Sequence, residues 1–158
     1  MTDPFSRVKD AIAGTLDALL PQQSDIAQPM VDAMRHAVLG GGKRMRPLMA
    51  CAACEAFSGS FKAALPAASG LEFIHAYSLI HDDLPAMDDD ELRHGQAATH
   101  IAFGEANAIL AGDSLHSLAF QSLAEAPDLS QAAKLRCISL LSTAAGWPGM
   151  AGGQCLDI

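Results

Sequence analysis

A run of acidic residues at the end of an apolar segment constrains this chain more than any other feature. Five aspartates fall within the nine residues 82–90, directly after the apolar run 71–80. Like charges this close repel one another and raise one another's pKa unless a cation neutralises them. All-oxygen ligands select hard cations such as magnesium, which proteins hold with one or two carboxylates together with substrate phosphates. The run therefore predicts either a magnesium site or a solvated acidic surface.

The spacing of the aspartates excludes a calcium-binding EF-hand loop. Such a loop requires a glycine at its sixth position and a glutamate at its twelfth. Counted from Asp88, those positions hold Arg93 and Thr99. The choice between a magnesium site and a solvated surface therefore depends on the rest of the chain.

Composition narrows the class of protein. The chain has 158 residues, of which 50% are hydrophobic and 5% aromatic, enough for one domain and biased towards helix formers. A formal charge of −8 argues against a nucleic-acid partner. The N-terminus lacks a basic region followed by an apolar block, and no apolar run approaches the ~20 residues of a membrane span. We therefore expect a cytoplasmic protein without a membrane span.

Apolar residues recur at helical spacing along most of the chain, and no segment shows the alternation of a half-buried strand. The sequence therefore predicts an all-α protein. Pro66 either interrupts the fourth helix or marks its true start. Cys51 and Cys54 fall in the third helix, where we expect structural thiols and not zinc ligands. The expected helices are 3–20, 26–39, 47–57, 61–84, 104–126 and 131–145.

A glycine-rich basic loop separates the second and third helices. Gly40, Gly41 and Gly42 are followed by Lys43-Arg44-Met45-Arg46-Pro47. Glycines let a backbone approach a ligand closely, and the start of a helix attracts anions. The loop therefore predicts a phosphate or diphosphate site, with a flexible linker carrying solvated bases as the alternative.

The fourth helix leads into the acidic run. At 100° per residue, His75, Ser78 and Asp82 share one face, which makes His75 a candidate diphosphate contact. Asp88 falls on the wrong side of an ideal helix, so a shared metal requires a distortion at Pro85. Arg93 either neutralises the carboxylates or grips the phosphate end of a metal-bound substrate.

Four blocks of this sequence, in order and spacing, resemble the trans-polyprenyl diphosphate synthases, and most closely the bacterial farnesyl diphosphate synthases. The blocks are 41–47, 75–90, 103–113 and 152–154. The resemblance covers about residues 27–158 and leaves 1–26 as an N-terminal helix. It implies a single, incomplete polyprenyl synthetase domain, the N-terminal portion of the isoprenoid-synthase helical bundle.

The resemblance also implies an activity, which is the condensation of isopentenyl diphosphate with an allylic diphosphate (dimethylallyl or geranyl) in isoprenoid biosynthesis. It makes Asp82 and Asp88 the ligands of Mg²⁺, within a catalytic motif that includes Asp83. Arg93 matches the catalytic contact to the allylic diphosphate.

The contacts to isopentenyl diphosphate follow in the same way. Lys43, Arg46 and His75 match three of them. His94 stands where the family usually has a second arginine, and a histidine is only partly charged near neutral pH.

Product length is a further expectation from the resemblance. Short-chain bacterial members carry two extra residues in the first Asp-rich motif and an aromatic residue five positions before it. Here these are Asp-Asp-x4-Asp and Tyr77, with Ser78 beside it. The pattern predicts farnesyl diphosphate, although Tyr77 projects well off the face of Asp82 on an ideal helix.

One expected motif is absent from these residues. Family members carry a second motif, Asp-Asp-x-x-Asp, in their C-terminal half, and full-length members are expected to form homodimers. Residues 1–158 contain no such motif, so we expect them to be inactive alone. The chain is then either half of a prenyltransferase or a non-catalytic half-domain that binds magnesium diphosphate or pairs with a partner chain. A terpene cyclase is disfavoured by the basic block 41–47.

Overall fold

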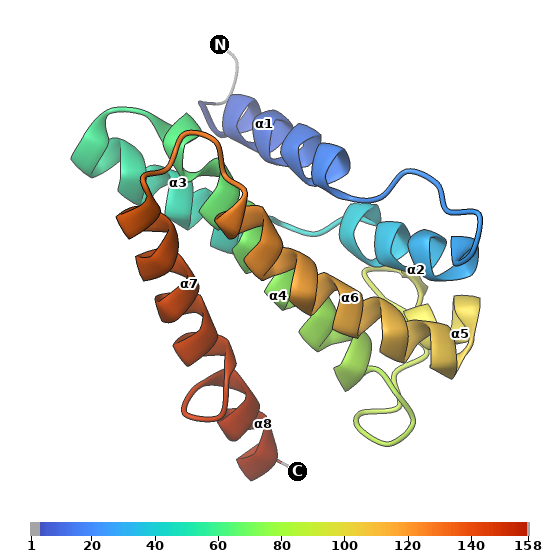
Figure 1. Cartoon of the computed structure of the whole chain (residues 1–158). Helices are drawn as coiled ribbons and strands as arrows, with labels where there is room; N and C mark the ends of the chain where they lie inside the picture. The colour runs from blue at the N-terminus through green and yellow to red at the C-terminus, as the bar shows by residue number, and fades with distance from the viewer. Residues whose placement is uncertain (1–3, 158) are drawn as a thin grey trace.

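Two long helices, α4 (Leu65–Asp82) and α6 (Glu105–Ala124), lie side by side at the centre of the molecule (Figure 1). The structure is a computed structural model that describes residues 4–157. Helices α1 (Pro4–Leu19) and α2 (Gln28–Leu39) lie on one side of this central pair, and α7 (Gln131–Ala145) and α8 (Met150–Asp157) lie on the other. Helix α3 (Met45–Ser58) contacts the N-terminal part of the bundle through α1 and α4.

Local sequence accounts for several helix ends. Ser130 caps α7, where its hydroxyl accepts a hydrogen bond from the backbone N–H of Ala133 at 3.2 Å. Gly59 ends α3 in the left-handed conformation, with φ of 82°. A short 3₁₀ helix, η1 (Phe61–Ala64), precedes α4, whose first turn contains Pro66. Pro66 therefore marks the true start of the fourth helix, as one of the two expectations had it.

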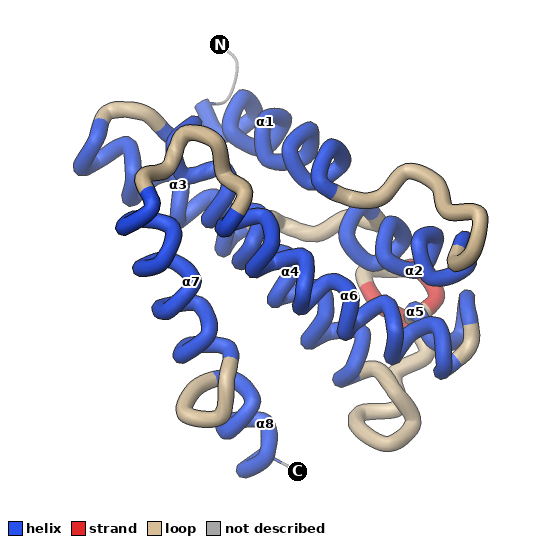
Figure 2. Tube along the Cα trace, in the orientation of Figure 1, coloured by secondary structure: helices blue, strands red, loops and turns tan. Residues whose placement is uncertain are grey.

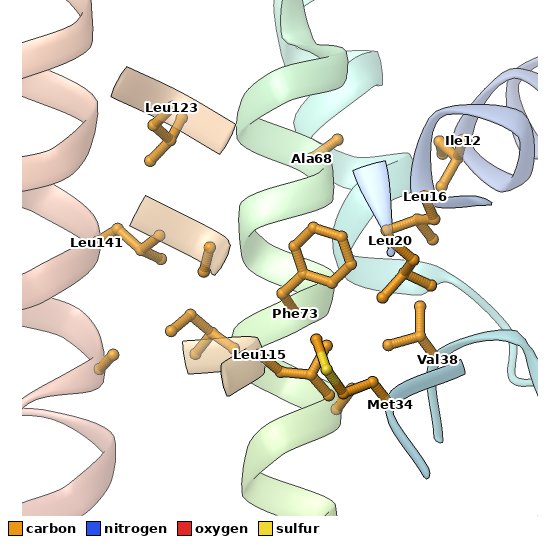
Figure 3. Packing of buried hydrophobic residues seen from close by; sticks show 14 of the residues in the cluster. Ile12, Leu16, Leu20, Met34, Val38, Ala68, Phe73, Leu115, Leu123 and Leu141 are labelled. Carbon is orange, nitrogen blue, oxygen red and sulfur yellow. The ribbon is translucent and has the colours of Figure 1, made fainter. Parts of the chain in front are cut away.

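The core surrounds Phe73 of α4, which is completely buried (Figure 3). Ile12 and Leu16 reach it from the α1 side, Val38 from α2 and Leu115 from α6. Apolar residues recur at helical spacing in these helices, as is typical of helices that bury one face in a core.

Small residues let α4 and α6 approach closely. A Cβ atom at Gly70 would lie 3.2 Å from the carbonyl oxygen of Ala119. A Cβ atom at Gly112 would lie 2.2 Å from Nε2 of His81, which is impossible without movement. The tight contact fixes the C-terminal end of α4, from which the acidic run extends.

The all-α class is confirmed, but the structure adds elements that the sequence pattern did not predict. Strands β1 (Leu92–Arg93) and β2 (Gln96–Ala97) form an antiparallel hairpin in the connection after α4 (Figure 2). Its turn residues His94 and Gly95 have positive φ of 54° and 80°, as a type I′ turn requires. His94-Gly95 is not one of the pairs, such as Asn-Gly or Asp-Gly, that mark this turn in a sequence, so the pattern carried no strong hairpin signal.

Two short helices were also missed. Helix α5 (Thr99–Phe103) lies in a segment expected to be a loop, and α8 follows Gly146-Trp147-Pro148-Gly149, where no helix was expected. Both are too short for an apolar period to be recognisable. Cys51 is buried, as expected, and burial raises the pKa of its thiol. Among residues 4–157, no helix has both the length and the apolar character needed to cross a membrane.

Candidate functional site

The acidic run begins where α4 ends. The helix stops at Asp82, and the backbone N–H of Asp88 donates a hydrogen bond to the carbonyl of Asp82 at 2.8 Å. Pro85 cannot extend the helical ladder, and the chain instead turns back on itself through residues 83–88. The turn brings Asp88 next to Asp82, although the two are six positions apart and would diverge on a straight helix. This is the distortion that a shared metal ion requires.

The electrostatics of Asp82 reflect this arrangement. Burial raises the pKa of its carboxyl, and the charges of Asp88 and then Asp83 raise it further. Among the residues that the structure describes, no three histidine, cysteine or acidic side chains are grouped closely enough to hold a metal ion by themselves. Two neighbouring carboxylates fit Mg²⁺ when substrate phosphates complete its coordination.

Asp83 has a different environment from Asp82. It is buried, and both of its carboxylate oxygens accept hydrogen bonds from Nε of Arg93, at 3.0 and 3.3 Å. Nη2 of Arg93 also contacts Asp83 and pairs with Asp90 at 3.1 Å. The hydrogen bond to Asp83 is the main reason that the pKa of Arg93 is raised. The structure therefore makes Asp83 the residue that orients Arg93, and the hairpin β1–β2 carries both Arg93 and His94.

A cavity of about 590 Å³ lies beside the glycine-rich loop, and we call it the basic cavity. Helix α4 contributes His75, and the hairpin turn contributes His94. Gly41 and Gly42 have φ of 125° and 106°, backbone conformations that favour glycine. The basic cavity is lined in part by Gly42, Lys43, Arg44, Arg46, Glu72, His75 and His94.

His75 is already influenced by the charges of this cavity. Burial lowers the pKa of its imidazole, and the nearby Arg46 lowers it further, while Glu72 acts in the opposite direction. A bound anion would oppose the effect of Arg46 and favour the protonated ring. The cavity thus gathers several cationic groups whose repulsion an anion would relieve.

A second cavity, of about 280 Å³, lies at the C-terminal end of α4, and we call it the apolar cavity. Tyr77, Ser78 and Asp82 line it from α4, and Met87 lines it from the acidic run. Helix α8 closes it with Met150, Ala151, Gln154 and Cys155. Tyr77 therefore shares a cavity with Asp82, although its projection on an ideal helix had suggested otherwise.

The structure thus brings together most of the residues selected from the sequence, but in two groups. Lys43, Arg46, His75 and His94 line the basic cavity, whereas Tyr77, Ser78 and Asp82 line the apolar cavity. His75 and Asp82, which were expected to share one face of the helix, therefore line different cavities.

Two charged residues that line the basic cavity were not selected as site residues, namely Arg44 and Glu72. Glu72 did carry a signal in the sequence, since it is the one acidic residue within the otherwise apolar stretch 71–80.

Comparison with known proteins identifies the family of this chain. The polyprenyl synthetase family model matches residues 27–158. Farnesyl diphosphate synthase of Haemophilus influenzae is 50% identical over 157 residues, covering 99% of this chain and 53% of the relative. The heterodimeric geranylgeranyl pyrophosphate synthase large subunit 1 of Arabidopsis thaliana is 44% identical over 146 residues, covering 90% of this chain and 39% of that subunit.

A solved structure shares the fold. The crystal structure of an FPP/GFPP synthase from Zymomonas mobilis, without ligand, superposes with a TM-score of 0.91 at 43% identity. The match covers 96% of this chain and 55% of that one, so the chain spans about half the length of the relatives it matches. The sequence blocks, the helical bundle and the family match agree, and the chain belongs to the polyprenyl synthetase family.

Proposed function

We propose that this chain is the N-terminal half of the active site of a prenyltransferase that joins isopentenyl diphosphate to an allylic diphosphate. The observation that carries the proposal is the pairing of two cavities along α4. One is lined by Lys43, Arg46 and His75, and the other combines Asp82 with an apolar wall. An enzyme that joins two diphosphate substrates needs a binding site for each diphosphate group and an apolar site for the hydrocarbon chain of the allylic substrate.

Each of the two cavities binds one of the two substrates. The basic cavity holds the diphosphate of isopentenyl diphosphate through charge-assisted hydrogen bonds. In the apolar cavity, the carbon–oxygen bond of the allylic substrate breaks and its electron pair leaves with the diphosphate. The double bond of isopentenyl diphosphate then attacks the allylic carbon, and the new cation forms a double bond by losing a proton from a neighbouring carbon to the departing diphosphate. Apolar walls keep water away from the cationic carbon.

We further propose Asp82 and Asp88 as the residues that hold Mg²⁺. Bound there, the ion would neutralise charge that develops on the leaving diphosphate. Arg93, which is held by Asp83 and Asp90, would supply a guanidinium to the same group. His94 lines the basic cavity at the position where the family usually has an arginine.

For the product, we propose a short-chain prenyl diphosphate, with farnesyl diphosphate first among the candidates. Tyr77 narrows the apolar cavity and is fixed by edge-to-face contacts with His81 and His116, at centroid distances of 5.7 and 5.0 Å. Tyr77→Ala in the complete enzyme is expected to lengthen the products, as measured by chromatography of the dephosphorylated alcohols. An unchanged product profile would refute the role of Tyr77.

The proposal is tested by assaying the chain with and without a separate C-terminal half taken from a relative. We expect residues 1–158 alone to form no product, and the mixture to form product when Mg²⁺ is present. Strong activity of residues 1–158 alone would contradict the half-site proposal. Binding of magnesium diphosphate without activity in any mixture would favour the alternative, a non-catalytic half-domain.

We also propose that the complete protein is a cytoplasmic homodimer. Helix α6 exposes Ile109 and Leu110, and α5, which packs against α6, exposes Ile101. Exposed apolar residues gathered on one face are typical of an interaction surface. Light scattering of the complete protein, with Leu110→Asp as the disruptive variant, measures the oligomeric state directly.

A further inference from the structure

Arg44 lies in the basic loop between two proposed diphosphate contacts, yet its side chain turns inwards. Nη1 donates to Oε1 of Glu72 at 2.5 Å, and Nη2 donates to the carbonyl of Val38, also at 2.5 Å. The exposed fractions of the two charged side chains are only 14% and 6%. Lys43 and Arg46, by contrast, are exposed. Arg44 is therefore occupied within the protein, whereas its neighbours are available to a ligand.

Each contact of Arg44 reaches a different helix. Val38 lies in the last turn of α2, where carbonyl groups lack helical partners and attract a cation. Glu72 belongs to α4, one turn before His75. Arg44 itself precedes α3 with a positive φ of 52°. One guanidinium therefore joins the end of α2, the start of α3 and the wall of α4 that carries His75.

The backbone of the loop shows why this connection matters. Gly41, Gly42 and Arg44 all have positive φ, and the left-handed region costs a residue other than glycine about 1–2 kcal/mol. A loop with adjacent glycines has many alternative conformations. Nη1 of Arg44 lies 3.9 Å from the position that a Cβ atom of Gly42 would occupy. The guanidinium therefore packs against the glycine-rich loop.

We propose that the buried Arg44–Glu72 pair is a positioning device that holds Lys43 and Arg46 in the geometry that binds diphosphate. The inference rests on the proposed function, because it assumes that the basic cavity binds diphosphate. In this proposal, neither Arg44 nor Glu72 contacts the substrate. Lysine at position 44 would keep the charge, but its single ammonium group lacks the planar fork that binds Glu72 and Val38 together.

The test compares two arginine-to-lysine variants of the full chain. R44K removes the planar guanidinium group that binds Glu72 and the carbonyl of Val38 beside the basic cavity. R35K is the matched control, because Arg35 also bridges a carboxylate and a backbone carbonyl, Asp17 at 2.6 Å and Pro21 at 3.5 Å, but does not line the basic cavity. Calorimetry measures the affinity of each variant for inorganic diphosphate. Mg²⁺ is left out so that Asp82 and Asp88 do not contribute to binding through a metal ion. Thermal unfolding measures any general loss of stability.

We expect R44K to weaken diphosphate binding about tenfold, the equivalent of one good hydrogen-bonded contact, while R35K binds as the original chain does. Equal affinity of R44K and the original chain would overturn the positioning role and leave the proposed function intact. An original chain that does not bind diphosphate would overturn both. The two proposals therefore fail in distinguishable ways.

A second variant, E72Q, decides the question if R44K does not fold. Removing a negative charge beside an anion site should by itself tighten anion binding. If Glu72 acts by holding Arg44, E72Q instead weakens binding, because the ion pair is replaced by a weaker hydrogen bond from the guanidinium to an uncharged amide oxygen. Weaker binding by E72Q supports the proposal, and unchanged or tighter binding contradicts it.

Discussion

Asp82 is a carboxylate whose surroundings oppose its ionisation. Its pKa is raised by burial, Asp88 and Asp83, so the folded chain retains the proton to a higher pH than the unfolded chain. The stability that this group contributes is fully present below its unfolded pKa and is lost as the pH rises through its folded pKa. At neutral pH, ionised Asp82 therefore lowers the free energy of unfolding until a cation binds.

Asp82→Asn should consequently raise the melting temperature of the metal-free chain at pH 7, because the amide carries no charge to desolvate. The same change should abolish the further rise in melting temperature that Mg²⁺ adds to the rise caused by diphosphate alone. Asp10→Asn, at an exposed position of α1, serves as the control and should alter neither value. A lower melting temperature of the metal-free Asp82→Asn variant would contradict this account of the acidic run.

Tyr77 is the only tyrosine of the chain, so ultraviolet absorbance of tyrosinate reports on it alone. Burial and then Asp82 raise its pKa above the ordinary value of 10.0, and its stabilising contribution should be lost as the pH rises through the folded pKa. Asp82→Asn should move the absorbance midpoint back towards the ordinary value, and Asp10→Asn should not. An unchanged midpoint in Asp82→Asn would show that Asp82 does not influence the phenol.

At the scale of elements, the contact between α4 and α6 determines how the site is held. Nε2 of His81 lies 3.2 Å from the carbonyl oxygen of Ile109, and Gly112 leaves room for the same ring. Tyr77 packs against His81 in turn. The wall of the apolar cavity is therefore supported by the packing of two helices.

Gly112→Ala should lower the free energy of unfolding by about 1–3 kcal/mol, the usual cost of overpacking, because the imidazole of His81 must move. Gly14→Ala is the matched control, since Gly14 lies in α1 and a Cβ atom there would meet nothing within 4 Å. Alanine should stabilise that helix by about 0.5–1 kcal/mol. Urea denaturation measures the free energy of unfolding of both variants. If both substitutions change it in the same direction, the contact between α4 and α6 is not tightly packed.

At the scale of the whole molecule, the side that carries α7 and α8 exposes large apolar groups. Leu135 and Leu140 of α7 are exposed, as are Trp147 and Leu156, with exposed fractions of 86% and 90% for the last two. Such a surface is costly in water and is typical of an interface. We expect the C-terminal half of the family's bundle to cover it.

Trp147 allows a direct measurement, because it is the only tryptophan of the chain. Addition of a tryptophan-free C-terminal half from a relative should shift its fluorescence to shorter wavelength as the indole leaves water. An N-terminal half of the same relative serves as the control and should cause no shift. Emission that stays unchanged with the C-terminal half would show that this surface does not bind it.

The sequence by itself determined the class, the main helices and the family blocks, because these depend on local properties. Helical periodicity located these helices, and α7 begins and ends at the expected residues. The acidic run and the basic loop indicated a magnesium site and a diphosphate site, and the family resemblance then selected the candidate residues without any knowledge of their contacts.

Only the tertiary structure decided how those residues group. It separated His75 from Asp82 into two cavities and paired the buried Asp83 with Arg93. It also joined Arg44 to Glu72, 28 positions along the chain. Contacts between distant residues leave no periodic signal in one sequence, since they depend on how helices pack and where a turn such as His94-Gly95 reverses the chain.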